Sequence, residues 1–347
     1  MTQPEISVSR SRWTPRDVAP FVSLMILLIF FTVATGGDFF KVATFVQVLR
    51  QGAILGIVAV GLTFVLLCGE IDLSVGMVAL WCASFSGWLY HAIVLDGWTR
   101  GETVLFEPLG VEHAGGGWIL LIIALPLLSC LLLGLISGWL TVWAALPSFI
   151  ITLAMMNIAD GLSAQVTQSA ALNVPEVLKT IGNRGIPITE VRELPYSALV
   201  AVAVFVLGHI VLEHTRFGRY VFMTGGNREA ARLAGVRTDA IIVACLAVSA
   251  FTAGLGGLIV AGKLANVSQD QNASLLLEAV ACVVLGGTSL FGGEGSMTKT
   301  AIGVLTFSVL AVGLNQISWV PDLLRPFVMG VVLMVALVVN GVLAKRG

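Results

Sequence analysis

Long uncharged apolar segments constrain this chain more than any other feature. Continuous runs such as Trp118–Leu133 and Pro326–Val339 have no stable place in water. A helix that crosses the hydrocarbon core of a bilayer, roughly 30 Å thick, needs about 20 such residues. Only 11% of the residues are charged, whereas a soluble domain carries about 25%. The chain is therefore predicted to be a polytopic integral membrane protein.

The segments are predicted to be helices, because the bilayer interior offers no water to backbone groups and a β-barrel would show alternating segments of about ten residues. The expected fold is an all-α polytopic transmembrane helical bundle of about ten spans. The spans lie near 18–36, 45–68, 74–92, 118–142, 147–167, 196–213, 239–261, 276–291, 298–318 and 322–343. The predicted organisation is a tail over 1–17, a transmembrane domain over 18–343 with a connection at 214–238, and a tail over 344–347.

The distribution of Lys and Arg predicts the orientation, because cytoplasmic loops carry an excess of these residues. The 214–238 connection is the most basic, with Arg216, Arg219, Arg228, Arg232 and Arg237. The two chain ends are also basic, with Arg10, Arg12, Arg16, Lys345 and Arg346. An even number of spans places all three groups on one side, so both termini are predicted to be cytoplasmic. The acidic 93–117 segment then faces the opposite side, and its role is not assigned.

The first motif, Gly69–Gly76, reads GEIDLSVG and joins the second and third spans. Its candidate pathway or capping residues are Glu70, Asp72 and Ser74. One interpretation is that Asp72 caps the third span, since an anionic side chain there bonds free backbone N–H groups. Alternatively, Asp72 takes part directly in transport, because carboxylates within membranes usually face a cavity or a partner. A proton-relay pair is less favoured, since no partnering basic residue is evident nearby.

The second motif fills the basic connection, Thr215–Val236. Gly225 and Gly226 are expected to break the chain, and Asn227 then caps a short helix that begins near Arg228 and ends at Gly235. This helix would present Ala230, Leu233 and Ala234 on one side. A helix of this size is marginal alone, so it is expected to pack on something. It either docks a cytosolic partner or belongs to a solvated basic loop that packs on lipid headgroups.

The third motif, Val284–Ser296, is rich in glycine and follows an apolar run. Its candidate pathway or turn residues are Gly286, Gly287, Thr288 and Ser289. Residues 293–300 come near the phosphate-loop pattern, but Thr298 stands where that pattern requires its second glycine. Nucleotide binding by this chain is therefore rejected. A tight or re-entrant turn, in which glycine supplies unusual backbone angles, is the preferred interpretation.

Two pairs of glycines, Gly52/Gly56 and Gly134/Gly138, have the G-x-x-x-G spacing. Small residues at this spacing let helix backbones approach closely inside membranes. Tight packing within one subunit is the preferred interpretation, and the alternative is a seam between two copies.

No other cluster predicts chemistry. The five cysteines lie inside apolar runs without paired spacing, which argues against a disulfide framework or a metal site. Asp160 and Glu278 fall within or near spans, where each either lines a path or bonds a neighbouring helix. The net charge of −1 and the lack of a long basic tract give no sign of nucleic-acid binding.

Together the three motifs resemble those of the membrane permeases of bacterial sugar ABC importers, in the ribose, xylose, arabinose and autoinducer-2 branch. The resembling stretches are 69–76, 215–236 and 283–293, and the resemblance runs from about residue 45 to the C-terminus. Glu70 stands where this family often has Gly or Ser, so the resemblance supports no special role for it.

The resemblance implies a permease in the bacterial inner membrane that forms an alternating-access pore with a second permease, identical or not. A cytosolic ABC ATPase would bind ATP and Mg, so this chain would hold no cofactor and would not itself be an enzyme. A periplasmic binding protein would deliver the sugar. The 214–238 connection would couple to the ATPase through Gly225, Gly226, Asn227, Arg228, Glu229, Ala230, Ala231, Arg232, Leu233 and Gly235. The alternative is a secondary transporter driven by an ion gradient, with Glu70, Asp72, Asp160 or Glu278 as coupling carboxylates.

Overall fold

A computed structural model describes residues 15–100, 103–110, 115–189, 192–272, 274–317 and 319–345. The elements in chain order are α1 (Pro15–Ala34), η1 (Asp38–Phe40), α2 (Val42–Leu67), α3 (Val75–Tyr90), η2 (His91–Leu95), β1 (Trp98–Arg100), β2 (Thr103–Phe106), α4 (Gly116–Trp143), α5 (Ser148–Thr167), β3 (Leu172–Asn173), α6 (Glu176–Asn183), β4 (Gly185–Thr189), β5 (Arg192–Pro195), α7 (Tyr196–His214), α8 (Arg216–Gly226), α9 (Arg228–Leu233), α10 (Thr238–Leu264), β6 (Asn266–Val267), α11 (Leu275–Leu285), α12 (Met297–Gln316), η3 (Asp322–Leu324) and α13 (Arg325–Lys345). The strands form three short antiparallel pairs, β1–β2, β3–β6 and β4–β5.

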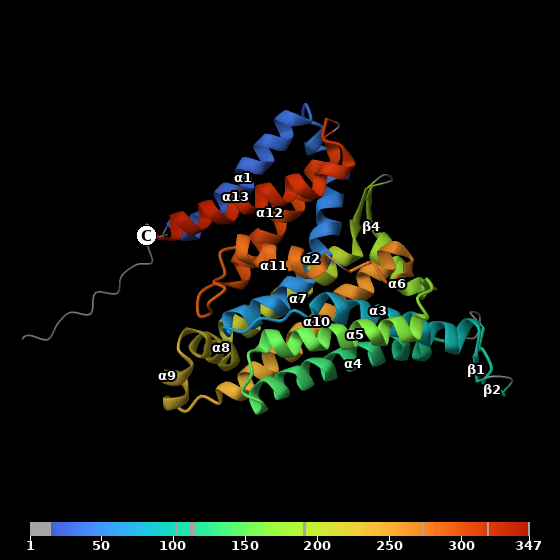
Figure 1. The fold of residues 1–347 in the computed structure, drawn as a ribbon. Helices are drawn as coiled ribbons and strands as arrows, with labels where there is room; N and C mark the ends of the chain where they lie inside the picture. Colours follow the sequence, from blue (N-terminus) through green and yellow to red (C-terminus); the bar gives the residue numbers. More distant parts are fainter. Residues whose placement is uncertain are drawn as a thin grey trace, which may run out of the picture.

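The helical fold predicted from the apolar segments is confirmed. Seven helices in the described part of the chain are long and apolar enough to cross a membrane: α2, α3 with its η2 extension, α4, α5, α7, α10 and α12. The first and last predicted spans correspond to α1, whose apolar part is Pro20–Ala34, and to α13, which has 21 residues. The chain is a multi-pass membrane protein built from a helical bundle (Figure 1).

The eighth predicted span, 276–291, is wrong as a continuous helix. The apolar run forms only the 11-residue helix α11, which spans about 16 Å and is too short to cross a bilayer. Gly286 and Gly287 end this helix, and residues 286–296 continue as a glycine-rich loop up to α12. Hydropathy alone cannot separate a short buried helix from a complete span when the loop that follows it is also poor in charge.

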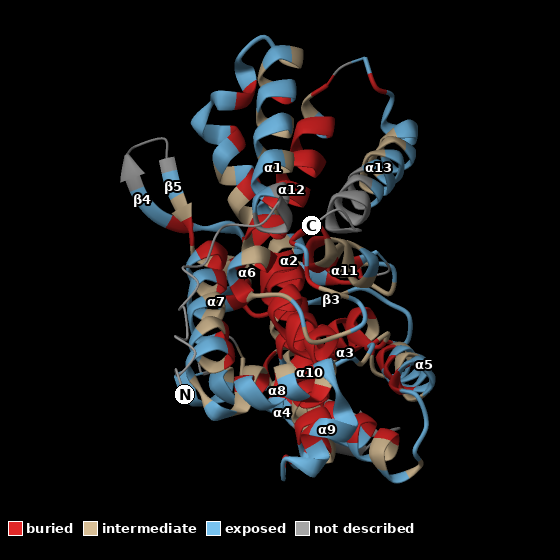
Figure 2. Ribbon diagram, turned by 90° about the vertical axis from the view of Figure 1, so that its left-hand side faces the viewer, coloured by how far each residue is buried: buried red, intermediate tan, exposed pale blue. Residues whose placement is uncertain are grey.

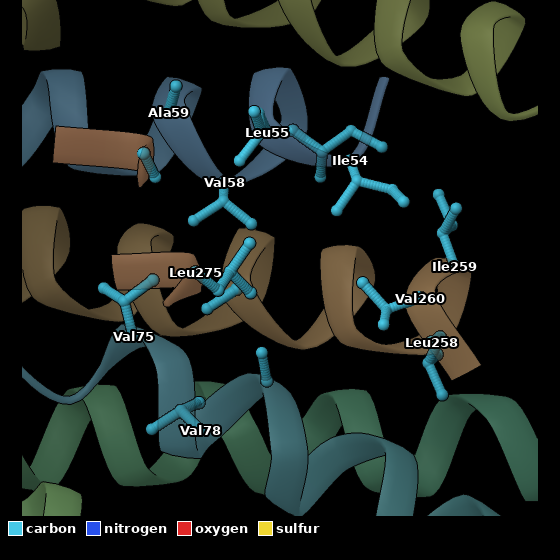
Figure 3. Packing of buried hydrophobic residues seen from close by; sticks show 14 of the residues in the cluster. Ile54, Leu55, Val58, Ala59, Val75, Val78, Leu258, Ile259, Val260 and Leu275 are labelled. Atoms are coloured by element: carbon cyan, nitrogen blue, oxygen red, sulfur yellow. The ribbon is translucent and has the colours of Figure 1, made fainter. Parts of the chain in front are cut away.

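Two layers of helices differ in how far they are buried. Within the most apolar stretch of each helix, 78% of the residues are buried in α2 and 72% in α10 and α12. The corresponding share is 22% in α4 and in α5. In Figure 2 the buried colour gathers on the central helices α2, α3 and α10, whereas α5 at the side is mostly exposed. Side chains from α2, α3, α10 and α11 interlock in the main cluster, including Val58, Val78 and Leu258 (Figure 3). The outer faces of α4 and α5 are therefore free to meet lipid or another subunit.

The N-terminal end of α1 and the C-terminal end of α13 lie on the side of the molecule that carries α8 and α9 (Figure 1). The strands β1 and β2 lie on the opposite side. This arrangement agrees with the prediction that both ends of the chain lie on one side. Most of the predicted tails, 1–14 and 346–347, lies outside the described residues, as do 101–102 and 111–114 of the acidic segment.

The two G-x-x-x-G glycine pairs pack against other helices of the same chain, which is the interpretation that the sequence favoured. A Cβ atom added at Gly134 would lie 2.6 Å from the Leu246 carbonyl oxygen, and one at Gly138 would lie 2.6 Å from Val243 Cα. These contacts bring α4 directly against α10. Gly52 in turn faces Ser308 of α12. Only the absence of a side chain allows helix backbones this close.

Candidate functional site

The three motifs meet at one point, the glycine junction, formed by Gly69, Gly225, Gly292 and Gly293. A Cβ atom at Gly292 would lie 2.7 Å from the Gly225 carbonyl oxygen and 2.9 Å from Gly69 Cα. One at Gly293 would lie 2.7 Å from Gly226 Cα. Gly69, Gly292 and Gly293 also have positive φ angles of 80°, 88° and 73°, which glycine adopts at no steric cost. Backbone therefore packs directly on backbone where the α2–α3, α8–α9 and α11–α12 connections meet.

The end of α2 holds this junction together. The Leu67 carbonyl oxygen accepts a hydrogen bond of 2.9 Å from the Gly293 backbone N–H. A Cβ atom at Gly225 would lie only 1.8 Å from the same oxygen, whereas one at Gly226 would meet nothing within 4 Å. Gly225 is thus required for close approach, and Gly226 is not. The predicted chain break at these two glycines is wrong, because both belong to α8 and the break falls at Asn227.

The short helix predicted after Asn227 is confirmed as α9. Asn227 Oδ1 accepts a hydrogen bond of 2.9 Å from the Ala230 backbone N–H, which caps the helix start. Gly235 ends the helix with a φ of 85°, and its N–H bonds the Arg232 carbonyl oxygen. These are the features of a glycine C-cap.

One side of α9 faces the protein and the other is open. Ala231 is buried against a cluster that includes Val236 and Ile241, whereas Leu233 is 82% exposed. Most of the other predicted coupling residues are exposed as well: Gly226, Asn227, Arg228, Glu229, Ala230, Arg232 and Gly235. Ala234, on the same side of the helix as Leu233 in the prediction, is also exposed. A large apolar side chain beside exposed arginines is therefore presented at this end of the molecule.

Glu70 joins the first motif to the second. Its Oε1 lies 3.4 Å from Nη1 of Arg228 at the start of α9. Arg228 Nη2 also lies 3.2 Å from Oδ1 of Asp239, at the start of α10. The Glu70 side chain is only 13% exposed, so this pair is less screened by water than a typical surface pair. The view that Glu70 lacks a basic partner is wrong, because Arg228 is distant in sequence and adjacent in space.

The comparisons with known proteins agree with the motifs. A family described as the permease component of the branched-chain amino acid transport system matches residues 44–337. The chain belongs to this permease family. A ribose import permease protein of Haemophilus influenzae is 33% identical over 300 residues, covering 85% of this chain and 84% of that protein.

Two further relatives extend the comparison. A ribose import permease protein of Bacillus subtilis is 31% identical, with 94% of this chain and 92% of that protein covered. A xylose transport system permease protein of Escherichia coli is 27% identical, with 93% and 91% covered. No solved structure gives a significant match. These matches confirm the resemblance to sugar-import permeases and do not favour the gradient-driven alternative.

Asp72 of the permease binds two segments together. Its Oδ1 accepts hydrogen bonds from the Ser74 backbone N–H at 2.9 Å and from Ser74 Oγ at 2.6 Å. Its Oδ2 accepts one of 2.8 Å from Ser249 Oγ on α10. Burial raises the pKa of the Asp72 carboxyl, and the bonds from Ser74 and Ser249 partly offset this effect. The residue at the α3 N-cap is Ser74 rather than Asp72, so Asp72 supports the helix start from two positions earlier.

The same segment is also anchored to α5. The Ile71 N–H donates to Ser148 Oγ at 2.9 Å, and the Leu73 N–H donates to Thr152 Oγ1 at 3.0 Å. Residues 70–74 of the permease therefore connect α9, α10 and α5 by side-chain bonds. Sequence reasoning missed Ser148, Thr152 and Ser249, because each is an isolated hydroxyl in an apolar helix. The one signal in the sequence is the spacing of Ser148 and Thr152, which are four positions apart and therefore lie on the same face of α5.

The third motif forms the expected tight turn. Gly287, Gly292, Gly293 and Gly295 have positive φ angles, and the Ser289 N–H bonds the Glu294 carbonyl oxygen at 2.8 Å. Gly286 packs against α12, where a Cβ atom would lie 2.3 Å from the Lys299 carbonyl oxygen. Thr288 is buried beneath the loop, with its Oγ1 unpaired. These residues build the turn that reaches the glycine junction.

The other carboxylates lie apart from the junction. Asp160 accepts a hydrogen bond of 2.8 Å from Gln269 Nε2, and Glu278 lies near Lys263 of α10. In the described residues of the permease, no three His, Cys, Asp or Glu side chains gather as metal ligands. All five cysteines are free and buried.

Proposed function

We propose that the chain is the transmembrane permease subunit of an ABC importer in the bacterial inner membrane, and that it translocates a sugar or a sugar-like polar solute. A periplasmic binding protein delivers the solute. A separate cytosolic ATPase binds ATP and Mg and hydrolyses ATP, so this chain binds no cofactor and catalyses no reaction. The observation that carries the proposal is the glycine junction, which ties an exposed helix rigidly to the ends of transmembrane helices.

In this function α9 is the docking helix for the ATPase. Leu233, 82% exposed, inserts into an apolar pocket of the partner, and the exposed arginines of 214–238 face its acidic groups. A docked apolar side chain at the centre of an interface contributes much of the binding free energy. The exposed Ala230 and Ala234 on α9 leave room for close approach of the partner.

Movement of α9 reaches the membrane by two routes in this proposal. The first runs through α8 and Gly225 to the end of α2 and to the 286–296 loop. The second runs from Arg228 through Glu70 to residues 70–74, which are bonded to α5 and α10. Both routes consist of direct contacts in the structure, so displacement of α9 shifts helix ends rather than a flexible loop.

A second permease, identical or not, completes the pore. The outer faces of α4 and α5 suit this role because these two are the least buried of the seven helices that are long and apolar enough to cross a membrane. Lipid covers whatever remains of these faces.

Docking is tested by changing Leu233 in the full importer. We expect Leu233→Asp to reduce co-purification of the ATPase and ATP-driven uptake by at least about tenfold, because a hot-spot residue contributes about 2 kcal/mol or more. Leu233→Met, which keeps an apolar side chain of similar size, is the control and retains both. Ala231 is unsuitable as a probe since it is buried. Normal ATPase recovery with Leu233→Asp contradicts docking at α9.

A further inference from the structure

A polar segment, residues 266–274, links β6 to α11 and has no part in the coupling described above. Its described polar residues are Asn266, Ser268, Gln269, Asp270, Gln271, Asn272 and Ser274. Two residues within the segment are enclosed by protein, since Val267 is 0% and Asn272 1% exposed. Polar side chains inside a membrane protein are costly and usually mark a functional path.

The segment runs along α3, deep into the bundle. A Cβ atom at Gly87 would lie 3.7 Å from Val267 Cγ2, and one at Gly76 would lie 2.9 Å from the Asn272 carbonyl oxygen. Gly76 and Gly87 are separated along the helix by about 16 Å, which is about half of the hydrocarbon core. Non-helical backbone at such depth is tolerated only where protein buries it or where it lines a cavity.

Four buried polar atoms in this segment have no protein partner: Gln269 Oε1, Gln271 Oε1, Asn272 Oδ1 and Asn272 Nδ2. The nitrogen atoms of both glutamines are already bonded. Gln269 Nε2 donates to Asp160 Oδ1 and Gln271 Nε2 donates to Asn266 Oδ1, each at 2.8 Å. Their carbonyl oxygens are thus held in fixed positions as acceptors. Because buried polar atoms are nearly always hydrogen-bonded, the three oxygens call for donors, and Asn272 Nδ2 for an acceptor, from outside the protein.

The open face of α5 gives access to this set. Asp160, which holds Gln269, is exposed on α5, and its neighbour Gly161 has open space around it. The Gln269 amide therefore lies against a helix whose outer face is free to border a path between two permeases.

We propose that the polar segment, together with Asp160, is the solute-binding site of the translocation path and that it takes a neutral polyhydroxylated solute. Hydroxyl groups donate to the amide oxygens and accept from Asn272 Nδ2. An anion is disfavoured by Asp160 and Asp270, and a cation leaves Nδ2 without an acceptor. The proposal rests on the transport function proposed above, and adds the residues that hold the solute.

Cysteine labelling tests whether the segment meets water during transport. The native cysteines are buried, so Gln269→Cys and Gln271→Cys can be labelled selectively by a charged, membrane-impermeant methanethiosulfonate. The control is Leu128→Cys, on the exposed apolar face of α4. In the full importer we expect labelling of both test positions in at least one nucleotide state. We also expect a mixture of ribose, xylose, arabinose, glucose and galactose to slow it at least threefold. Labelling no faster than at Leu128 in every state, or protection only by phosphate or sodium ions, overturns the proposal.

Uptake gives a second, independent test. Asn272→Leu keeps the side-chain volume but removes both unpaired polar atoms, and we expect it to lower ATP-driven uptake of the radiolabelled sugars at least tenfold while ATP hydrolysis continues. Asn173→Leu, at an exposed position in β3, is the control and transports normally. Unchanged uptake by Asn272→Leu overturns the site and leaves the importer intact. Absence of any ATP-driven uptake in the unaltered importer instead overturns the proposed function, and the labelling result then decides the site.

Discussion

At the scale of single residues, neighbouring positions in the glycine junction differ sharply in what they tolerate. Gly225 has the Leu67 carbonyl oxygen where a Cβ atom would go, and Gly226 has open space. The motif marks both glycines as equal, and only the three-dimensional contact separates them. Sequence alone cannot make this distinction, because it depends on the end of α2, which is far from Gly225 in the chain. The contact between Glu70 and Arg228 likewise joins residues 158 positions apart.

Alanine substitution should therefore have opposite effects at these two glycines. We expect Gly225→Ala to force apart α2, α8 and the 286–296 loop, lowering the melting temperature and abolishing ATP-driven uptake. Gly226→Ala should be neutral or slightly stabilising, because alanine is favoured over glycine in a helix by about 1 kcal/mol. Differential scanning fluorimetry in detergent measures both variants. Equal tolerance of the two substitutions contradicts the junction.

The Glu70–Arg228 ion pair predicts energetic coupling between the first two motifs. In a double-mutant cycle with Glu70→Gln and Arg228→Gln, we expect the two changes in unfolding free energy to be non-additive by about 0.5–1 kcal/mol. The coupling should shrink at high salt, because ions screen partly exposed pairs. Strictly additive effects at low salt would show that the pair contributes nothing.

Asp72 is predicted to act through its hydrogen bonds rather than through its charge. Asn keeps an oxygen for the Ser74 N–H, and its Nδ2 can donate to Ser249 Oγ, so Asp72→Asn should cost only about 1 kcal/mol and spare transport. Asp72→Ala leaves three donors unpaired and should be clearly less stable. Melting temperature and uptake are measured together for both variants. Loss of transport by Asp72→Asn at normal stability would place the carboxyl in the transport path instead.

At the scale of elements, periodic and apolar patterns predicted most helices, and the failures have physical causes. The helix α9 could be predicted because Asn227 and Gly235 are local capping signals. The helix α11 was overextended because its end depends on Gly286 packing against α12, a contact between distant segments. The sequence gives no sign of the role proposed for the polar segment 266–274, because the burial of Asn272 cannot be predicted from a short polar stretch.

Close contact between α4 and α10 gives a prediction at this scale. We expect Gly138→Ala to lower the melting temperature by several degrees, because its Cβ atom would lie 2.6 Å from the backbone of α10. Gly161→Ala on α5 is the matched control, since nothing lies within 4 Å of its Cβ position, and it should be neutral or slightly stabilising. A similar loss in both variants would mean that helix propensity, not the seam, governs stability.

At the scale of the whole molecule, the central helices α2, α3, α10 and α12 form a buried scaffold, and the functional surfaces lie on its periphery. The proposed docking helix α9 lies at one end, and the polar segment 266–274 contacts α5 through Gln269 and Asp160. The resemblance of the motifs was sufficient to predict the family. It could not predict which contacts connect α9, the proposed docking helix, to the membrane-spanning helices, because those contacts join segments from four separate parts of the chain.

The most direct test of the proposed transport function is uptake by the purified importer in proteoliposomes, with the ATPase and the binding protein present. We predict that a radiolabelled sugar accumulates only when ATP is supplied on the ATPase side, and that dissipating proton and sodium gradients leaves the rate unchanged. Sugar uptake by this chain alone, driven by an ion gradient without ATP, would contradict the assignment as an ABC permease.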